Sequence, residues 1–250
     1  MNNAIQGLWI GSELSVMEQL SIASFLHNGH TYHLYVYGEV KNIPAGTVIK
    51  DANEILPRAS IFQYTGSGSY AGFANFFRYK LLLERGGWWA DTDIVCLKPF
   101  DFREDYVFAS EKFKKDVLIT CGVLKAPAGS EVMEFAWRVC QTKNPIDLIW
   151  GETGSKLMAE AIKKYSLQKY QKSHLVFCPL DYLEWSRVLE PAAEITFDET
   201  TCAIHLWNEM WRSAGQDKNA SYLKQCLYEQ LKQKYLSVNV LTHRATRPRP

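Results

Sequence analysis

Two aspartates one residue apart, Asp91 and Asp93, are the side chains of this sequence best suited to chemistry. They follow a Gly-Gly-Trp-Trp-Ala run and precede an apolar stretch over residues 94–97. Alternation along an extended segment predicts that both carboxylates share one face, where they repel each other. A divalent cation between or near them relieves this repulsion, so the pair predicts a metal site. The alternative is a solvated strand end.

The elements that must position this pair alternate between strand and helix. Residues 4–11 predict a first strand, Ser12 is expected to cap a helix, and residues 31–37 predict a second strand. A helical pattern over residues 70–85 stops at two glycines just before the aspartates. A strand, a helix and a strand with short joins form a βαβ unit, which indicates an α/β fold that begins with parallel strands.

The rest of the chain continues this mixture. The pattern predicts strands at 106–109, 117–120, 175–178 and 201–207, and helices at 51–56, 131–142, 155–165 and 220–235. We expect a core domain over residues 1–212, and a C-terminal helix and basic tail over residues 213–250 that pack on it or extend from it.

Composition narrows the class of protein. The chain has 250 residues, 47% hydrophobic and 22% charged, as expected for a large soluble domain. A net charge of +1 argues against nucleic acid as the main partner. Six scattered cysteines without a Cys-x-x-Cys pair, and no signal peptide, predict mostly buried, reduced thiols in a cytoplasmic protein. No apolar run approaches the roughly 20 residues of a membrane span.

The segment 243–250 is short and basic. It has two interpretations. One is a frayed terminus, and the other is a peripheral contact with anionic lipid at the inner face of a membrane.

The helix end, the glycines and the aspartates read Arg78-Tyr79-x-x-Leu82-x-x-x-Gly86-Gly87-x-Trp89-x-Asp91-x-Asp93. This pattern resembles the sugar-binding DXD region of glycosyltransferases with the GT-A fold. It is most similar to family 32, which includes capsular polysaccharide enzymes and yeast α-mannosyltransferases and is related to the clostridial glucosylating toxins. The resemblance implies a Rossmann-like, mostly parallel central sheet flanked by helices, with a helical C-terminal part.

Three further segments match the family in the same order. They are Trp9-Ile10-Gly11, Gly151-Glu152-Thr153-Gly154 and Ala203-Ile204-His205-Leu206-Trp207-Asn208-x-x-Trp211. The resemblance spans roughly residues 4 to 212. These ordered flanks make it far more specific than a lone Asp-x-Asp.

The resemblance assigns a metal to the aspartates. Asp93 would bind the ion directly, and Asp91 would contact the nucleotide ribose or a metal-bound water. The C-terminal segment would supply one more ligand, His205 in preference to Asn208. An imidazole among oxygen ligands suits Mn²⁺ better than Mg²⁺. The alternative for His205 is a hydrogen-bonded histidine at a strand end.

The resemblance also assigns the donor contacts. Trp9, beside Ile10 and Gly11, would stack on the base. Arg78 would reach sugar hydroxyls or phosphate, and Trp211 would close over the diphosphate and exclude water. The alternatives are core packing for the two tryptophans and a structural salt bridge for Arg78.

The loop with Thr153 and Gly154 would lie at the donor sugar, and its Glu152 is the candidate catalytic carboxylate. Three positions depart from the family pattern, and Trp89, in place of the usual tyrosine, is the mildest change. Asn75 replaces the usual aspartate three residues before the arginine, which leaves donor identity open, and Ser155 replaces a proline. A front-face mechanism would need no enzyme base.

We therefore expect a metal-dependent, retaining glycosyltransferase that moves a hexose from a nucleotide sugar, with UDP as the favoured nucleotide, to a saccharide or lipid-linked acceptor in surface polysaccharide synthesis. The alternative is a non-catalytic nucleotide-sugar-binding or scaffolding protein on the same fold. A zinc site at His27, His30 and His33 is disfavoured, because Gly29 prevents one shared helical face. A dinucleotide loop at residues 66–72 is disfavoured because its glycine spacing is wrong.

Overall fold

The structure is a computed structural model that describes residues 4–236 of the chain. Its strands are β1 (Ile5–Trp9), β2 (Tyr32–Val36), β3 (Val48–Asp51), β4 (Gly87–Ala90), β5 (Ile94–Cys96), β6 (Val107–Phe113), β7 (Asp116–Ala126) and β8 (Ala203–His205). Its α-helices are α1 (Val16–His27), α2 (Ala71–Arg85), α3 (Glu131–Gln141), α4 (Leu157–Lys164), α5 (His174–Phe177), α6 (Asn208–Ser213) and α7 (Leu227–Leu236).

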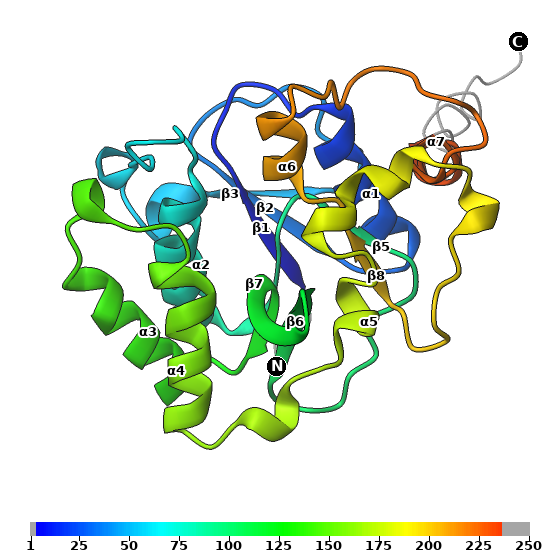
Figure 1. Cartoon of the computed structure of the whole chain (residues 1–250). Helices are drawn as coiled ribbons and strands as arrows, with labels where there is room; N and C mark the ends of the chain where they lie inside the picture. The colour runs from blue at the N-terminus through cyan, green and yellow to red at the C-terminus, as the bar shows by residue number, and fades with distance from the viewer. Residues whose placement is uncertain (1–3, 237–250) are drawn as a thin grey trace, which may run out of the picture.

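A six-stranded sheet forms the centre of the molecule, in the order β3-β2-β1-β4-β7-β6 (Figure 1). Strands β3, β2, β1 and β4 run parallel, whereas β7 pairs antiparallel with both β4 and β6. Strands β5 and β8 form a separate antiparallel pair. In α/β folds of this kind, ligands bind beyond the carboxyl ends of the parallel strands.

Helices cover both faces of the sheet because successive strand residues point to opposite sides. Trp89 packs in a core cluster with residues of α2, α3 and α4, whereas its neighbour Trp88 packs in a cluster with residues of α1 and α5. Figure 1 shows α2, α3 and α4 on one side of the molecule and α1 and α7 on the other. The expected α/β class, with a mostly parallel central sheet flanked by helices, is confirmed.

The N-cap of α1 is Ser15, so the prediction of Ser12 was wrong. The Ser15 hydroxyl accepts a hydrogen bond from the Met17 amide at 3.3 Å, and the Glu18 carboxylate accepts one from the Ser15 amide at 2.8 Å. This reciprocal capping box satisfies two amide groups that a cap at Ser12 would leave free. It also fixes the side chain of Glu18, which is almost fully buried.

The turn from α2 into β4 depends on Gly86. This residue has φ of 61°, and a Cβ at its position would lie 2.5 Å from the Ala128 backbone nitrogen. Only glycine combines this backbone conformation with so close an approach. The predicted helix over residues 70–85 is confirmed, and Gly86 directs the chain from it into the centre of the sheet.

Three other expectations were wrong in detail. The predicted strand at 175–178 is the short helix α5, which Ser173 caps. The short helix expected at 51–56 is a 3₁₀ turn over Ala52–Glu54, and it follows strand β3, which the sequence did not predict. Strands β6 and β7 form a longer hairpin than the predicted strands at 106–109 and 117–120. Short apolar runs do not distinguish strand from helix by periodicity alone.

The C-terminal part packs against the first helix. Leu231 and Tyr235 of α7 share a core cluster with Met17 and Leu20 of α1. The basic segment 243–250 lies outside the described residues. Within them, no helix is both long and apolar enough to cross a membrane. All six cysteines are free and five are buried, as predicted.

Candidate active site

The two aspartates lie in a turn at the carboxyl end of β4, so the prediction of one extended segment was wrong. The Asp91 amide donates to the Gly122 carbonyl at 2.8 Å, and the Ile94 amide donates to the Asp91 carbonyl at 3.1 Å. This turn takes the chain from the central sheet into β5 of the second sheet. The two carboxylates nevertheless remain close to each other, as the predicted metal site requires.

Asp91 is held by two donors that bind the same oxygen. Arg78 donates to Asp91 Oδ1 at 2.9 Å, and the Trp89 indole N–H donates to it at 2.7 Å. Within the described residues, Asp91 Oδ2 has no hydrogen-bond partner. Its side chain is 27% exposed, so Oδ2 is the oxygen free to meet a ligand.

Arg78 is committed to the protein. It also donates to the Cys121 carbonyl at 2.7 Å and lies over the Trp89 ring at 5.0 Å, and it is only 4% exposed. This is the structural salt bridge that the sequence left as the alternative. Direct contact between Arg78 and the donor stays a prediction.

Asp93 is held by the C-terminal segment. His205 Nε2 lies 3.2 Å from Asp93 Oδ2, and the Asn208 amide donates to the same oxygen at 2.9 Å. The antiparallel β5–β8 ladder sets this geometry, because Ile94 pairs directly with His205. The structure therefore joins the aspartate turn to the His/Trp segment, as the resemblance implied.

These contacts shift the pKa values of the two carboxylates in opposite directions. Burial raises the pKa of Asp91, and Asp93 adds to this effect while Arg78 opposes it, so the pKa stays above its ordinary value. Burial also acts to raise the pKa of Asp93, but the charge and hydrogen bond of His205 outweigh it and leave the pKa lowered. Burial lowers the pKa of His205, but Asp93 more than reverses this and holds it well above its ordinary value.

Asp91, Asp93 and His205 form a group whose potential ligand atoms all lie within 4.8 Å of one another. Two carboxylate oxygens and one imidazole nitrogen suit Mn²⁺, and the carboxylates also suit Mg²⁺. The residues present therefore fit a divalent metal. The Asn208 side chain is differently engaged, because its carbonyl oxygen accepts from Lys218 at 2.9 Å.

The loop expected at the donor sugar does reach α2. The Asn75 side chain lies 3.5 Å from the Thr153 hydroxyl, and the Tyr79 hydroxyl donates to the Thr153 carbonyl at 2.8 Å. A Cβ at Gly154 would lie 3.2 Å from the Asn75 amide nitrogen. Asn75, Thr153 and Gly154 are thus brought together, each buried.

The Glu152 carboxylate forms its contacts outside the group of Asn75, Thr153 and Gly154. Its carboxylate pairs with Lys143 at 2.5 Å and accepts from the Ile149 amide at 3.3 Å. The Lys143 hydrogen bond holds the pKa of this carboxyl below its usual range. Its role as the catalytic carboxylate stays a prediction.

The tryptophans at the two ends of the site differ. Trp9 is partly exposed at the end of β1, ahead of Ile10 and Gly11, and its indole N–H donates to the Glu13 carbonyl at 3.1 Å. Trp211 is fully buried in a core cluster and donates to the Leu206 carbonyl at 2.8 Å. Trp211 is therefore a core residue here, the alternative named from the sequence, and its closure over a diphosphate stays a prediction.

Trp207 is a member of the site that sequence reasoning missed. Its ring stacks on His205 with centroids 3.7 Å apart, and its indole N–H donates to the Leu180 carbonyl at 3.0 Å. Its backbone has φ of 57° and ψ of 53°, the left-handed region, which is strained for a bulky side chain. Trp207 thus fixes the orientation of the imidazole. Its position between two predicted ligands was the available signal.

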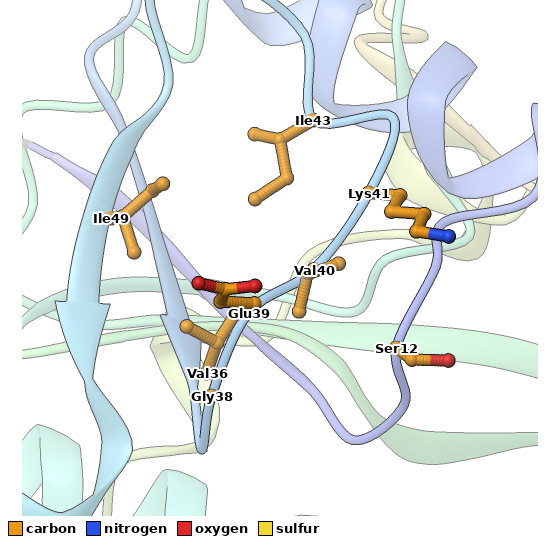
Figure 2. A pocket seen from close by; sticks show the side chains of 8 residues that line it. All are labelled: Ser12, Val36, Gly38, Glu39, Val40, Lys41, Ile43 and Ile49. Atoms are coloured by element: carbon orange, nitrogen blue, oxygen red, sulfur yellow. The ribbon is translucent and has the colours of Figure 1, made fainter.

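A cavity of about 550 Å³ lies next to the carboxyl ends of β1 and β2 (Figure 2). It is lined by Ser12, Val36, Gly38, Glu39, Val40, Lys41, Ile43 and Ile49. Figure 2 shows Ile43 and Ile49 projecting toward each other across it. The predicted site residues are not in this lining, so the cavity is separate from the Asp91–Asp93–His205 group.

The comparisons with known proteins agree with this site. Residues 15–114 match the family described as "Glycosyltransferase sugar-binding region containing DXD motif". None of the curated proteins matches the chain. The matched residues 15–114 contain Asn75, Arg78, Asp91 and Asp93, so the resemblance expected from the sequence is confirmed. This part of the chain is thus similar to the sugar-binding region of DXD glycosyltransferases.

Solved structures of glycosyltransferases show distant similarity. The PaToxG glycosyltransferase has 14% identity and a TM-score of 0.48, over 96% of this chain and 87% of that chain. GlyE of Streptococcus pneumoniae TIGR4 has 11% identity and a TM-score of 0.45, over 96% and 65%. The galactosyltransferase LgtC, in complex with donor and acceptor sugar analogues, has 11% and 0.37, over 63% and 70%.

Proposed function

We infer that the protein is a metal-dependent, retaining glycosyltransferase that transfers a hexose from a UDP-sugar to a saccharide or lipid-linked acceptor. Surface polysaccharide synthesis is the proposed setting, in the cytoplasm or at the inner face of a membrane. The observation that carries the proposal is the Asp91–Asp93–His205 group at the carboxyl end of β4, inside the matched sugar-binding region. Its donor set favours Mn²⁺, with Mg²⁺ as the second choice.

A nucleotide diphosphate sugar fits this arrangement because its leaving group gains negative charge as the reaction proceeds. Asp91, Asp93 and His205 would hold the metal, which supplies Lewis-acid neutralisation of the diphosphate when bound. Arg78 and Trp89 orient Asp91 through Oδ1 and leave Oδ2 to the ligand. Trp207 fixes the ring of His205 by stacking on it.

The donor sugar would lie at Asn75, Thr153 and Gly154, which converge beside α2. Trp9 would stack on the uracil base at the end of β1. Asn75 offers both a donor and an acceptor to sugar hydroxyls, whereas an aspartate offers only acceptors. We propose that Asn75 is the residue that sets donor choice.

Retention is proposed to follow a front-face path. The bond from the anomeric carbon to the donor phosphate oxygen breaks, and its electron pair stays on that oxygen. The acceptor hydroxyl oxygen bonds the anomeric carbon from the same face, and its proton passes to the leaving phosphate. This path requires no enzyme base, which agrees with the pairing of Glu152 with Lys143.

The test combines donor binding with one ligand substitution. Wild-type protein and Asp93→Ala are titrated with Mn²⁺ and a panel of UDP-sugars and GDP-mannose, and donor hydrolysis is measured. We expect Asp93→Ala to lose metal-dependent donor binding by more than the roughly 10- to 100-fold typical of outer-shell partners, while its fold is kept. Asp116→Ala, at the exposed start of β7, is the matched control and should bind as wild type does.

Two outcomes would count against the proposal. If wild-type protein neither binds nor hydrolyses any nucleotide sugar, the activity is refuted. If it binds donor in a metal-dependent way but gives no turnover across a broad acceptor screen, the alternative of a non-catalytic nucleotide-sugar-binding protein holds. Burial of Asn75, whose side chain lies against Thr153, is the observation that favours this alternative.

A further inference from the structure

Lys218 lies in the loop between α6 and α7 and reaches back to the site. Its ammonium group pairs with Glu18 at 2.5 Å, donates to the Asn208 side-chain carbonyl at 2.9 Å and lies 5.6 Å from the centre of the Trp9 ring. No motif of the family pattern marks this residue. Its three neighbours come from the end of β1, the first turn of α1 and the start of α6, so one cation joins three parts of the fold.

The lysine is held in place from several directions. Glu18 is 1% exposed, and its second carboxylate oxygen accepts from the Ser15 amide at 2.8 Å, so it is a fixed partner. The Tyr228 hydroxyl donates to the Lys218 carbonyl at 2.7 Å. Next along the chain, the Asn219 side chain accepts from the Val16 amide at 2.9 Å. Such anchoring reduces the conformational entropy that a lysine loses when it binds an anion.

The position of the ammonium group relative to the candidate site is specific. Asn208, which accepts from Lys218, donates its backbone amide to Asp93. Trp9, which the ammonium faces, is the residue proposed to stack on the donor base. The cation therefore lies between the metal-binding group and the base position. In a nucleotide sugar, the diphosphate spans this interval.

The ammonium group also keeps capacity for another ligand. An ammonium has three N–H donors, and two of them have acceptors among the described residues. The side chain is 23% exposed, so the third N–H is accessible to a ligand. Hydrogen bonds between an ammonium and a phosphate oxygen are charge-assisted and stronger than neutral ones.

The geometry points to Lys218 as a binding residue for the diphosphate of the donor, a protein-borne positive charge that acts together with the metal. This inference rests on the proposed function. A nucleoside diphosphate carries more negative charge than a nucleotide sugar, so the lysine binds the released nucleotide more tightly than the intact donor. Uridine lacks the diphosphate and makes no contact with it.

The experiment compares UDP with uridine on the full chain in the presence of Mn²⁺. Lys218→Met keeps the length of the side chain and removes its charge, and Lys218→Arg keeps the charge. We expect Lys218→Met to weaken UDP binding about 10-fold or more, as for loss of a charge-assisted hydrogen bond, with uridine binding changed less than about 2-fold. Lys218→Arg should restore most of the UDP affinity. Calorimetry measures the binding of both UDP and uridine.

Two control variants separate binding from loop anchoring. Asn219→Ala removes the neighbouring contact with α1 but no charge, and Lys224→Met removes an exposed charge from the same loop. Lys224→Met should bind UDP as wild type does, and Asn219→Ala should weaken UDP binding far less than Lys218→Met does. The inference is overturned if Lys218→Met binds UDP normally, or if Asn219→Ala weakens UDP as much as Lys218→Met. If wild-type protein binds neither UDP nor GDP, the proposed function fails and this inference fails with it.

Discussion

At the residue scale, the two aspartates are neighbours in sequence but have different partners. Asp91 is bound by Arg78 and Trp89 through one oxygen, whereas Asp93 is bound by His205 and the Asn208 amide. The first arrangement fixes the orientation of a carboxylate and leaves its other oxygen free. The second ties a carboxylate to a segment far along the chain. The two carboxylates can therefore bind one ion together, while Asp91 presents a free oxygen and Asp93 connects the site to the C-terminal segment.

Removal of Arg78 should leave the carboxylate of Asp91 without its charged partner. We expect Arg78→Met to lower the free energy of unfolding by about 3–5 kcal/mol near neutral pH, because a buried ion pair loses one partner. Arg85→Met is the matched control. Arg85 pairs with Glu54 at 3.5 Å with both side chains about half exposed, so its loss should change stability by less than about 1 kcal/mol. Urea denaturation measures both, and equal losses would contradict the expectation.

Metal binding should displace a proton from His205. Without metal, Asp93 holds the pKa of His205 well above its ordinary value, so the imidazole is protonated near neutral pH. A metal needs the neutral ring, so the apparent affinity for Mn²⁺ should increase as pH rises from about 6 to about 8. Calorimetry in buffers of different ionisation enthalpy counts the released protons. An affinity independent of pH, with no proton released, would show that His205 is not a ligand.

At the element scale, the site depends on two changes of direction along the chain. Gly86 turns α2 into β4, and the turn at Asp91–Asp93 moves the chain from β4 into β5. Strand β5 then pairs with β8, which sets His205 opposite Ile94. The first sends the chain into the central sheet, and the second places the two carboxylates at the carboxyl end of β4.

Substitution of Gly86 tests the first of these turns. We expect Gly86→Ala to destabilise the fold by about 2 kcal/mol or more, because a Cβ meets the Ala128 backbone in a left-handed conformation. Gly66→Ala is the matched control, since a Cβ there meets open space and its φ lies outside the left-handed region. Its stability should change by less than about 1 kcal/mol. Chemical denaturation compares the stability of the two variants. A Gly86→Ala variant as stable as wild type would contradict this expectation.

The same elements explain what the sequence could predict. The helix over 70–85, the glycine stop and the first two strands follow from periodicity and turn residues, which are local. The Asp91–Asp93 turn could not be predicted, because it depends on a hydrogen bond to Gly122 across the sheet. The helix at 174–177 replaced a predicted strand, because a four-residue apolar run fits either state.

The candidate site, like the fold, was predicted only in part. Asp91, Asp93 and His205 were recognised from the family pattern, which records residue types in order. Lys218 and Trp207 were missed, because their roles depend on contacts between segments distant in sequence or on an unusual backbone conformation. Trp211 was assigned to the donor, yet it lies in the core, because a tryptophan in a motif does not reveal which side it faces.

At the scale of the whole molecule, the site joins the two halves of the chain. Asp93 contacts His205, 112 positions away, and Glu18 contacts Lys218, 200 positions away. A ligand that contacts all of these segments should oppose unfolding of the entire fold. Its stabilisation depends on its free concentration relative to its dissociation constant.

Metal and nucleotide together should therefore raise the melting temperature. At about 100 times the dissociation constant, ligand binding contributes roughly 2.7 kcal/mol, which corresponds to a shift of about 5–10 °C for a chain of this size. Differential scanning calorimetry with Mn²⁺ and UDP measures this shift. Asp93→Ala should show none under the same conditions. An equal shift in both proteins would place the ligand elsewhere.

The pairing of β5 with β8 also has a consequence for synthesis of the protein. The ribosome makes Asp93 long before His205, the residue that lies against it. A nascent or prematurely terminated chain that stops at residue 200 has β5 without its partner strand and an incomplete metal-binding group. The candidate metal-binding group is therefore complete only once β8 has been made and has paired with β5.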